Sequence, residues 1–255
     1  MPEHPAFILR SVMDEDRITV VDLDEEEIVG YRQVVKGQYV VEDFAVSPDN
    51  LIFLPVSWFE IAVDDGKCVL VADIESEKLL KDSITTSLWP TYIYSFLDRT
   101  KALVGHPGII WGDTDVVSTE LDVVNRKVIK TLRFTALLDN VLSFEDGGTY
   151  LLYTQGWSPY QQLVQRFDAE GDSIIGEPYE LEEISSGAAL VNAADVPRDE
   201  FAAPGGKGIV FFNRNTGVLT GEVTLGDSPD RCLVHNGKLY VCHNNGEIMK
   251  YGNHN

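Results

Sequence analysis

Five short segments of the chain share one pattern: an apolar run, then an aspartate or asparagine, a polar turn and a second apolar run. Apolar runs of this length, bounded by turn residues, are typical of β-strands. The shared aspartate or asparagine, called the anchor below, recurs at spacings of 51, 49, 46 and 45 residues. The segments are "ITVVDLDEEEIVG", "VLVADIESEKLLK", "VSTELDVVNRKVIK", "LVQRFDAEGDSIIG" and "GIVFFNRNTGVLTG", with anchors Asp22, Asp73, Asp122, Asp168 and Asn213.

A repeat of this length with several strands in each unit predicts an all-β chain folded as a β-propeller. From Asn213 through the two termini to Asp22 the chain covers 64 residues. That distance fits one repeat of about 48 residues plus loose ends, whereas two repeats would each be too short for four strands. We therefore expect a single β-propeller domain over residues 1–255 with five blades. Its ring is closed by N-terminal strands (7–35) and C-terminal strands (231–251) that share one blade; six blades, two of them three-stranded, is the alternative.

The last part of the chain also resembles a known kind of repeat. Residues 224–251, "TLGDSPDRCLVHNGKLYVCHNNGEIMKY", resemble the propeller repeats of the YVTN and NHL kind, in which glycine and proline precede a strand and a "dGkLYV" strand follows. The matching positions are Gly226, Pro229, Gly237, Leu239, Tyr240 and Val241. "FAVSPDNLIFLPV" (44–56) fits the same pattern more loosely. The resemblance implies the propeller fold and no particular activity.

Charge and composition restrict the partners. The chain has 41 acidic and 20 basic residues, a formal net charge of −21. Such a protein repels nucleic-acid phosphates and anionic lipid surfaces, so we expect neither nucleic acid nor a membrane as a partner. The N-terminus lacks the basic and apolar regions of a signal peptide, and no apolar stretch is long enough to span a bilayer. We expect a cytoplasmic location.

The three cysteines, Cys68, Cys232 and Cys242, have no metal-type spacing. If a tight turn at residues 236–237 joins the last two strands, Cys232 lies opposite Val241 and Cys242 lies opposite Arg231. This register disfavours a disulfide and predicts reduced thiols.

The tryptophans occur at related places in the repeat. Trp111 and Trp157 each precede an anchor by 11 residues, and Trp58 precedes one by 15. All three map to the connection between the second and third strands of a blade, and Trp89 maps to a connection between blades. Both kinds of connection open on the same face of a propeller, so we expect a tryptophan-lined channel mouth, with Gln155 beside Trp157. Aromatic rings there suit a small molecule, a glycan or a peptide; the alternative is that each ring packs one blade against the next.

The same connections carry groups that can perform acid–base chemistry. Glu60, His106 and Asp113 are the candidate catalytic residues if the protein is an enzyme, that is a hydrolase, lyase or isomerase. Asp115, Asp195, Arg198 and Asp199 belong to connections that we expect at the same mouth. No cofactor or metal is predicted for a binding protein, while an enzyme could hold Ca²⁺ or Mg²⁺ through the carboxylates.

Three functions therefore remain open at this stage. The leading one is a non-catalytic propeller that binds a small molecule, glycan or peptide at its tryptophan-bearing mouth. The second is an enzyme that uses the same pocket. The third is a protein-interaction scaffold, which predicts an exposed apolar patch on a face or rim.

Overall fold

The computed structural model describes residues 5–12, 15–22, 24–36, 44–55, 68–80, 83–86, 90, 92–96, 99–106, 116–134, 137–143, 148–155, 161–168, 173–180, 199–205, 208–225, 229–235, 238–243 and 247–251. The chain divides into two compact units, Met1–Phe134 and Thr135–Asn255. Each unit has its own sheets and apolar cores. A single domain over residues 1–255 stays a prediction.

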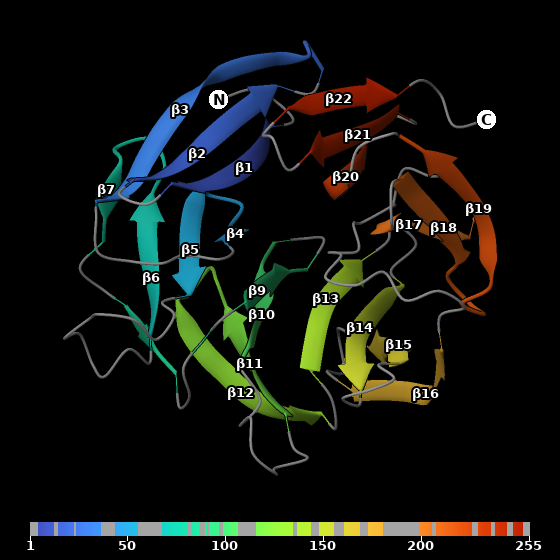
Figure 1. The fold of residues 1–255 in the computed structure, drawn as a ribbon. Helices are drawn as coiled ribbons and strands as arrows, with labels where there is room; N and C mark the ends of the chain where they lie inside the picture. Colours follow the sequence, from blue (N-terminus) through green and yellow to red (C-terminus); the bar gives the residue numbers. More distant parts are fainter. Residues whose placement is uncertain are drawn as a thin grey trace. The chain divides into compact units, whose positions relative to one another are not determined.

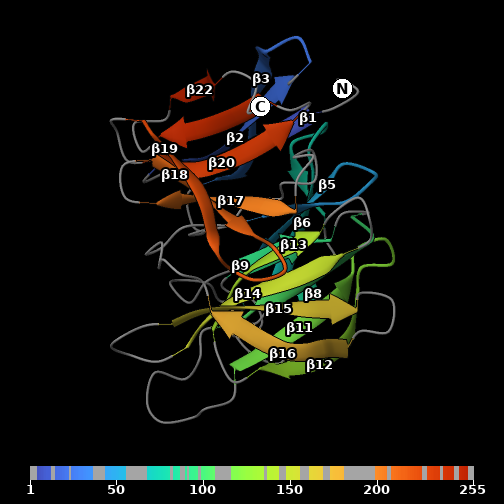
Figure 2. The same ribbon diagram turned by 90° about the vertical axis from the view of Figure 1, so that its right-hand side faces the viewer.

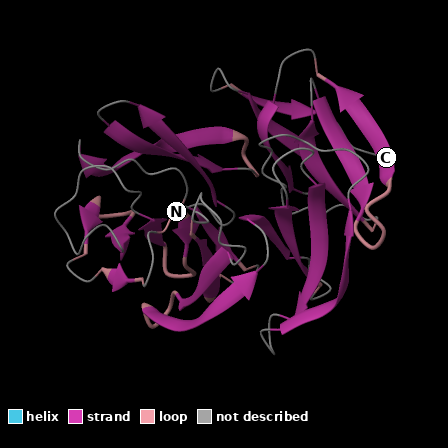
Figure 3. Ribbon diagram, turned by 60° about the horizontal axis from the view of Figure 1, so that its bottom comes forward, coloured by secondary structure: helices cyan, strands magenta, loops and turns pink. Residues whose placement is uncertain are grey.

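Every regular element among the described residues is a β-strand, and Figure 3 draws no helix there. The described part of the chain accordingly contains no helix that is long and apolar enough to cross a membrane. The predicted all-β fold class is confirmed.

The described strands of the first unit form three antiparallel sheets (Figure 1). The first sheet consists of β1 (Pro5–Val12), β2 (Glu15–Asp22) and β3 (Glu27–Lys36). The second consists of β4 (Ala45–Val46), β5 (Leu51–Pro55), β6 (Cys68–Asp73) and β7 (Lys78–Leu79), with β8 (Ile84–Thr85) also paired to β6. The third consists of β9 (Tyr92–Ser95), β10 (Lys101–Gly105), β11 (Val116–Asp122) and β12 (Lys127–Phe134).

The described strands of the second unit also form three antiparallel sheets (Figure 2). One consists of β13 (Leu137–Ser143), β14 (Thr149–Gln155), β15 (Gln161–Asp168) and β16 (Ser173–Glu180). The next consists of β17 (Glu200–Gly205), β18 (Gly208–Asn213) and β19 (Leu219–Thr224), and the last of β20 (Pro229–His235), β21 (Lys238–His243) and β22 (Ile248–Tyr251).

The anchors end strands, as the repeat predicts. Asp22, Asp73, Asp122, Asp168 and Asn213 are the last residues of β2, β6, β11, β15 and β18. In the Asp73 turn, Oδ1 accepts hydrogen bonds from the backbone N–H groups of Glu75 (2.8 Å) and Ser76 (3.1 Å). The anchors Asp22, Asp122 and Asn213 accept equivalent bonds. Aspartate and asparagine recur here because their short side chains can fix such a turn through its own backbone.

Apolar side chains are buried on both faces of the middle sheet of each unit. In the first unit Ile52, Leu54, Leu70 and Ala72 pack toward Ile18, whereas Phe53, Val69 and Val71 pack toward residues of β9, β10 and β11. In the second unit Val210 and Phe212 pack toward β14 and β15, whereas Ile209 and Phe211 pack toward β20 and β21. Successive side chains of a strand point to opposite faces. A sheet enclosed by neighbours on both faces therefore needs continuous apolar runs such as "CVLVAD" and "GIVFFN".

The described strands differ from the expected blade arrangement. They form six sheets, the number of the alternative rather than the favoured five, and three of these sheets have three strands. The first and last groups of strands, β1–β3 and β20–β22, pair into separate sheets, so the expected sharing of one sheet is not observed among the described residues. The expectation required four strands in every blade, whereas a three-stranded sheet fits into a much shorter segment. The number of blades stays a prediction. Closure of a ring stays a prediction.

The register of the last hairpin agrees with the sequence. Cys232 pairs with Val241, and Arg231 pairs with Cys242. All three cysteines are free: Cys68 and Cys232 are buried and Cys242 is half-buried. Burial raises the pKa of the Cys232 thiol to about 12.

Candidate functional site

Most of the predicted site residues lie outside the described residues. These are Trp58, Trp89, Trp111, Trp157, Glu60 and Asp113, together with Asp115, Asp195 and Arg198. Gln155 is the last residue of β14, where its backbone pairs with Gln161. The assignment of these residues to a channel mouth stays a prediction.

The strands that flank three of the tryptophans occupy equivalent places in their sheets. Trp58 falls between β5 and β6 in the chain, Trp111 between β10 and β11, and Trp157 between β14 and β15. Each of these connections joins the second and third strands of its sheet, and the third strand ends at an anchor. The strands that end at the other two anchors are β2 and β18. Each is joined to the strand before it, β1 or β17, by two residues (13–14 and 206–207) that include no tryptophan. The length of the connection and the presence of tryptophan therefore go together.

His106 is the one candidate catalytic residue that the structure describes. It follows β10 directly and is buried, with 1% of its surface exposed. Its Nε2 lies 2.7 Å from Oγ1 of the buried Thr119 on β11. A buried imidazole that is hydrogen-bonded to a neighbouring strand holds the two strands together where the tryptophan-bearing connection begins.

Sequence reasoning missed a buried carboxylate on the next residue of β11. Glu120 is completely buried, and Lys130 lies directly opposite it on β12, with its Nζ 3.9 Å from Oε2. Lys101 reaches the same carboxylate from β10, with its Nζ 3.1 Å from Oε1. A buried carboxylate is tolerated only when opposite charges compensate it. The feature that could have predicted this cluster is a lysine on each of the two strands beside β11. It can be recognised only when the pairing register of the strands is known.

Asp199 is the one residue of the 192–207 segment's polar candidates whose surroundings the structure describes, and its expected place at the mouth stays a prediction. Asp199 directly precedes β17, whose first residue pairs with the anchor Asn213. Its Oδ1 accepts hydrogen bonds from Nη2 (2.8 Å) and Nε (3.1 Å) of Arg214, in the turn that follows this anchor. Asp199 therefore belongs to the anchor end of its sheet.

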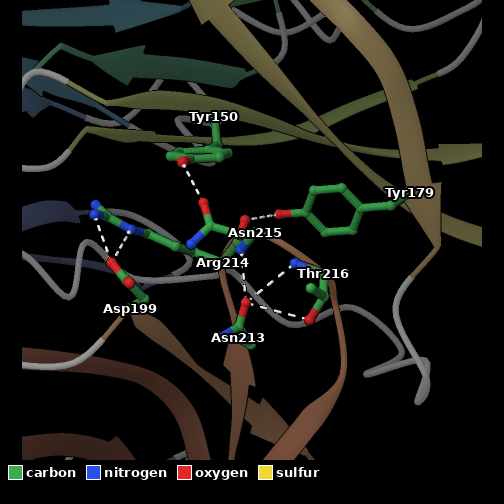
Figure 4. A network of polar contacts seen from close by, with 7 residues as sticks. All are labelled: Tyr150, Tyr179, Asp199, Asn213, Arg214, Asn215 and Thr216. Atoms are coloured by element: carbon green, nitrogen blue, oxygen red, sulfur yellow. Dashed lines mark hydrogen bonds and ion pairs between the residues drawn. The ribbon is translucent and has the colours of Figure 1, made fainter.

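Two tyrosines fasten the same turn to the preceding sheet (Figure 4). Tyr179 of β16 donates a hydrogen bond to the backbone carbonyl of Arg214, and Tyr150 of β14 donates one to Oδ1 of Asn215 at 3.3 Å. Burial raises the pKa of Tyr179, with a smaller contribution from Tyr150 in the same direction, so its hydroxyl stays a donor. The group joins two sheets of the second unit and performs a structural role.

Metal ligands do not gather in the described part of the chain, which contains no group of three or more His, Cys, Asp or Glu side chains that could hold an ion. The histidine at the end of β21, His243, is buried and its Nε2 lies 3.4 Å from the Tyr251 hydroxyl. Like the anchors, His243 closes a strand, and its backbone N–H bonds to the carbonyl of Glu247 across the turn.

Comparison with known proteins identifies the fold. No protein family and no curated protein matches the sequence. Among solved structures, the β-propeller domain of Cps50 (Swd1) from Myceliophteria thermophila is similar, with a TM-score of 0.58 and 11% identity over 96% of this chain and 92% of that one. Hydrazine synthase of Kuenenia stuttgartiensis is similar with a TM-score of 0.57 and 12% identity, over 93% of this chain and 90% of that one. At such identities the likeness shows the fold alone, and it assigns this chain the β-propeller fold predicted from its repeats.

Proposed function

We propose that the protein is a non-catalytic binding β-propeller with six blades, one for each sheet. It holds a small molecule, a glycan or a peptide with the connections that carry Trp58, Trp111 and Trp157. The observation that carries the proposal is the contrast between connections at the same place in the repeat: three, of 12, 10 and 5 residues (56–67, 106–115 and 156–160), contain tryptophan, and two are two-residue turns without it. Packing between blades alone would not require the longer connections to carry the tryptophans.

The alternative, an enzyme that uses the same connections, has less support. Its candidate base, His106, is buried and hydrogen-bonded to Thr119. A general base must come within hydrogen-bond reach of the proton that it removes. The burial of this ring therefore favours binding over catalysis.

The test is tryptophan fluorescence combined with a binding screen. Variants that retain a single tryptophan are expected to be quenched by acrylamide at positions 58, 111 and 157. A hit from a glycan array or a peptide library should lose its binding to Trp157→Ala, while the thermal melt stays within a few degrees of the wild type. The matched control is Tyr31→Ala, which removes an exposed aromatic ring on β3 (59% exposed). Full protection of all the tryptophans from acrylamide would refute the proposal, and conversion of the bound compound, followed by NMR, would show an enzyme instead.

A specific observation also favours the third function, a protein-interaction scaffold. Apolar residues are exposed on the outer strands of several sheets, at the sixth and seventh positions after an anchor. They are Ile28 and Val29 on β3, Val128 and Ile129 on β12, and Ile174 and Ile175 on β16. Exposed apolar residues on outer strands are what a scaffold with an interacting rim predicts.

A further inference from the structure

The outer strand β12 combines exposed apolar residues with an unusual local charge. Residues 125–134, "NRKVIKTLRF", contain four of the chain's 20 basic residues and none of its 41 acidic ones. Val128 (38% exposed) and Ile129 (40% exposed) lie between these charges. This segment is therefore a basic, partly apolar edge on a protein whose net charge is −21.

The described basic side chains of β12 and its turn remain partly exposed although some of them form ion pairs. The Lys127 side chain is 64% exposed, and its Nζ lies 4.0 Å from Oδ2 of Asp122. Lys130 shares the single negative charge of Glu120 with Lys101. Arg126 adds an exposed cation in the turn that precedes the strand.

β12 also has a backbone edge that no described strand occupies. It is the last strand of its sheet and pairs with β11 alone. Such an edge presents N–H and C=O groups that can take up another extended chain.

Among the outer strands compared, β12 has the highest local positive charge. β3 carries Arg32 and Lys36, but Glu27 and the acidic turn at 24–26 outweigh them. β16 has the same pair of apolar residues but carries Glu177 and Glu180 and no basic residue. β22 carries a single lysine, Lys250, beside its exposed Ile248 and Met249. A partner that could pair with any outer strand would not explain why the cations are concentrated on β12.

We propose that β12 binds an extended acidic peptide segment of a partner protein, which adds to the sheet as a further strand. Backbone hydrogen bonds supply the pairing, Val128 and Ile129 contact apolar side chains of the peptide, and Arg126, Lys127 and Lys130 face its carboxylates. The proposal is independent of any ligand at the tryptophan-bearing connections.

Lysine on an edge strand has a second known role, which is to prevent pairing with other chains. The two roles differ in what the wild type binds. If the cations only protect the edge, the wild type binds no acidic peptide, and the charge-reversed protein binds none either because its glutamates keep the edge charged. If they select an acidic strand, the wild type binds that peptide and the charge-reversed protein does not.

The probe is a fluorescein-labelled synthetic peptide of alternating glutamate and valine, followed by fluorescence anisotropy. The test variant combines Arg126→Glu with Lys127→Glu. The first repeat has glutamate at both equivalent positions, Glu26 and Glu27. This variant should weaken binding at least about tenfold, because both attraction and steering are lost. The matched control is Lys250→Glu on β22, which makes the same kind of charge change on another outer strand and should leave the affinity within about twofold.

Two further comparisons separate strand addition from simple charge attraction. The variant Ile129→Thr carries the residue found at the equivalent position of the last anchored repeat, Thr220. It should weaken binding although the charge of the protein is unchanged. In NMR spectra of the labelled protein, the peptide should shift the backbone amides of 127–134 first. A version of the peptide N-methylated at its valines should bind at least about tenfold more weakly, because it lacks donors for pairing.

Several results would overturn the proposal. Equal binding of polyglutamate without valine would show charge attraction alone, and equal binding by the charge-reversed variant would place the site elsewhere. Self-association that disappears in that variant, without peptide binding by the wild type, would make a second copy of the chain the occupant. Circular dichroism and thermal melts check that each variant is folded before it is compared.

Discussion

Replacement of Gly217 by alanine should destabilise the protein strongly, because two separate effects act at this position. Gly217 is the fourth residue after the anchor Asn213 and has a φ of 72°. A Cβ atom there would lie 2.6 Å from the carbonyl oxygen of Glu180 and 2.8 Å from Cδ2 of Tyr179. The left-handed backbone costs about 1–2 kcal/mol for alanine, and relief of such overpacking costs about 1–3 kcal/mol more.

The lower entropy of the unfolded alanine chain offsets about 0.4–1 kcal/mol of this cost. We therefore expect Gly217→Ala to lower the free energy of unfolding by about 1–5 kcal/mol. The measurement is urea unfolding followed by far-UV circular dichroism. The melting temperature should fall by about 2–4 °C for each kcal/mol of destabilisation.

Two other glycines of the second unit separate the two effects. Gly176 also has a φ of 72°, but a Cβ there would meet nothing within 4 Å, so Gly176→Ala measures the backbone cost alone. Gly221 has the same open surroundings without a positive φ, and Gly221→Ala should be neutral or slightly stabilising. The expected order of destabilisation is Gly217, then Gly176, then Gly221. If Gly217→Ala proves no worse than Gly176→Ala, the argument from the contact with Glu180 and Tyr179 is refuted.

The remaining predictions concern titration, a buried charge and thiol reactivity. Hydrogen bonds from the Ser76 backbone N–H and from neighbouring groups outweigh partial desolvation and lower the folded-state pKa of Asp73 below 3.8, so its ionised form stabilises the fold above that value. The stability advantage of wild type over Asp73→Asn should thus shrink as the pH falls from about 5 to about 2, and a constant advantage in urea unfolding would contradict this. Glu120→Gln should lower the free energy of unfolding by about 3–5 kcal/mol, because two lysines then face a neutral amide. An unchanged urea midpoint would show that the charge cluster is not stabilising. In the native protein Cys242 should react with a thiol reagent before Cys232, whose pKa is raised to about 12 by burial; a faster Cys232 or a disulfide on a non-reducing gel would refute the assignment of buried, reduced thiols.

Local chemistry explains why the sequence predicted so much of the fold. An aspartate or asparagine that bonds to its own backbone defines a turn without help from distant residues, so the anchors mark the ends of five strands. The hairpin at residues 236–237 is equally local, and its register was therefore predicted correctly for Cys232 and Cys242.

The number of sheets was beyond such reasoning, because strand pairing depends on which segments meet in space. Three-stranded and four-stranded sheets leave similar local patterns, so β1–β3 and β20–β22 were expected to share a blade and instead pair separately. The same limit applied to the site: His106 was a candidate catalytic residue only if the protein is an enzyme, and its burial against Thr119 depends on the pairing of β10 with β11.

By itself, the sequence determined the all-β class, the repeat, the anchor turns and the places of the tryptophans in the chain. These features depend on side-chain period and on interactions between residues a few positions apart. Only the tertiary structure decided that Glu120 is buried between two lysines, that Asp199 binds Arg214 at the anchor end of its sheet, and that β12 leaves a basic edge open. Each of these depends on strand register, which brings together residues that are distant in the chain and is fixed by the packing of whole sheets.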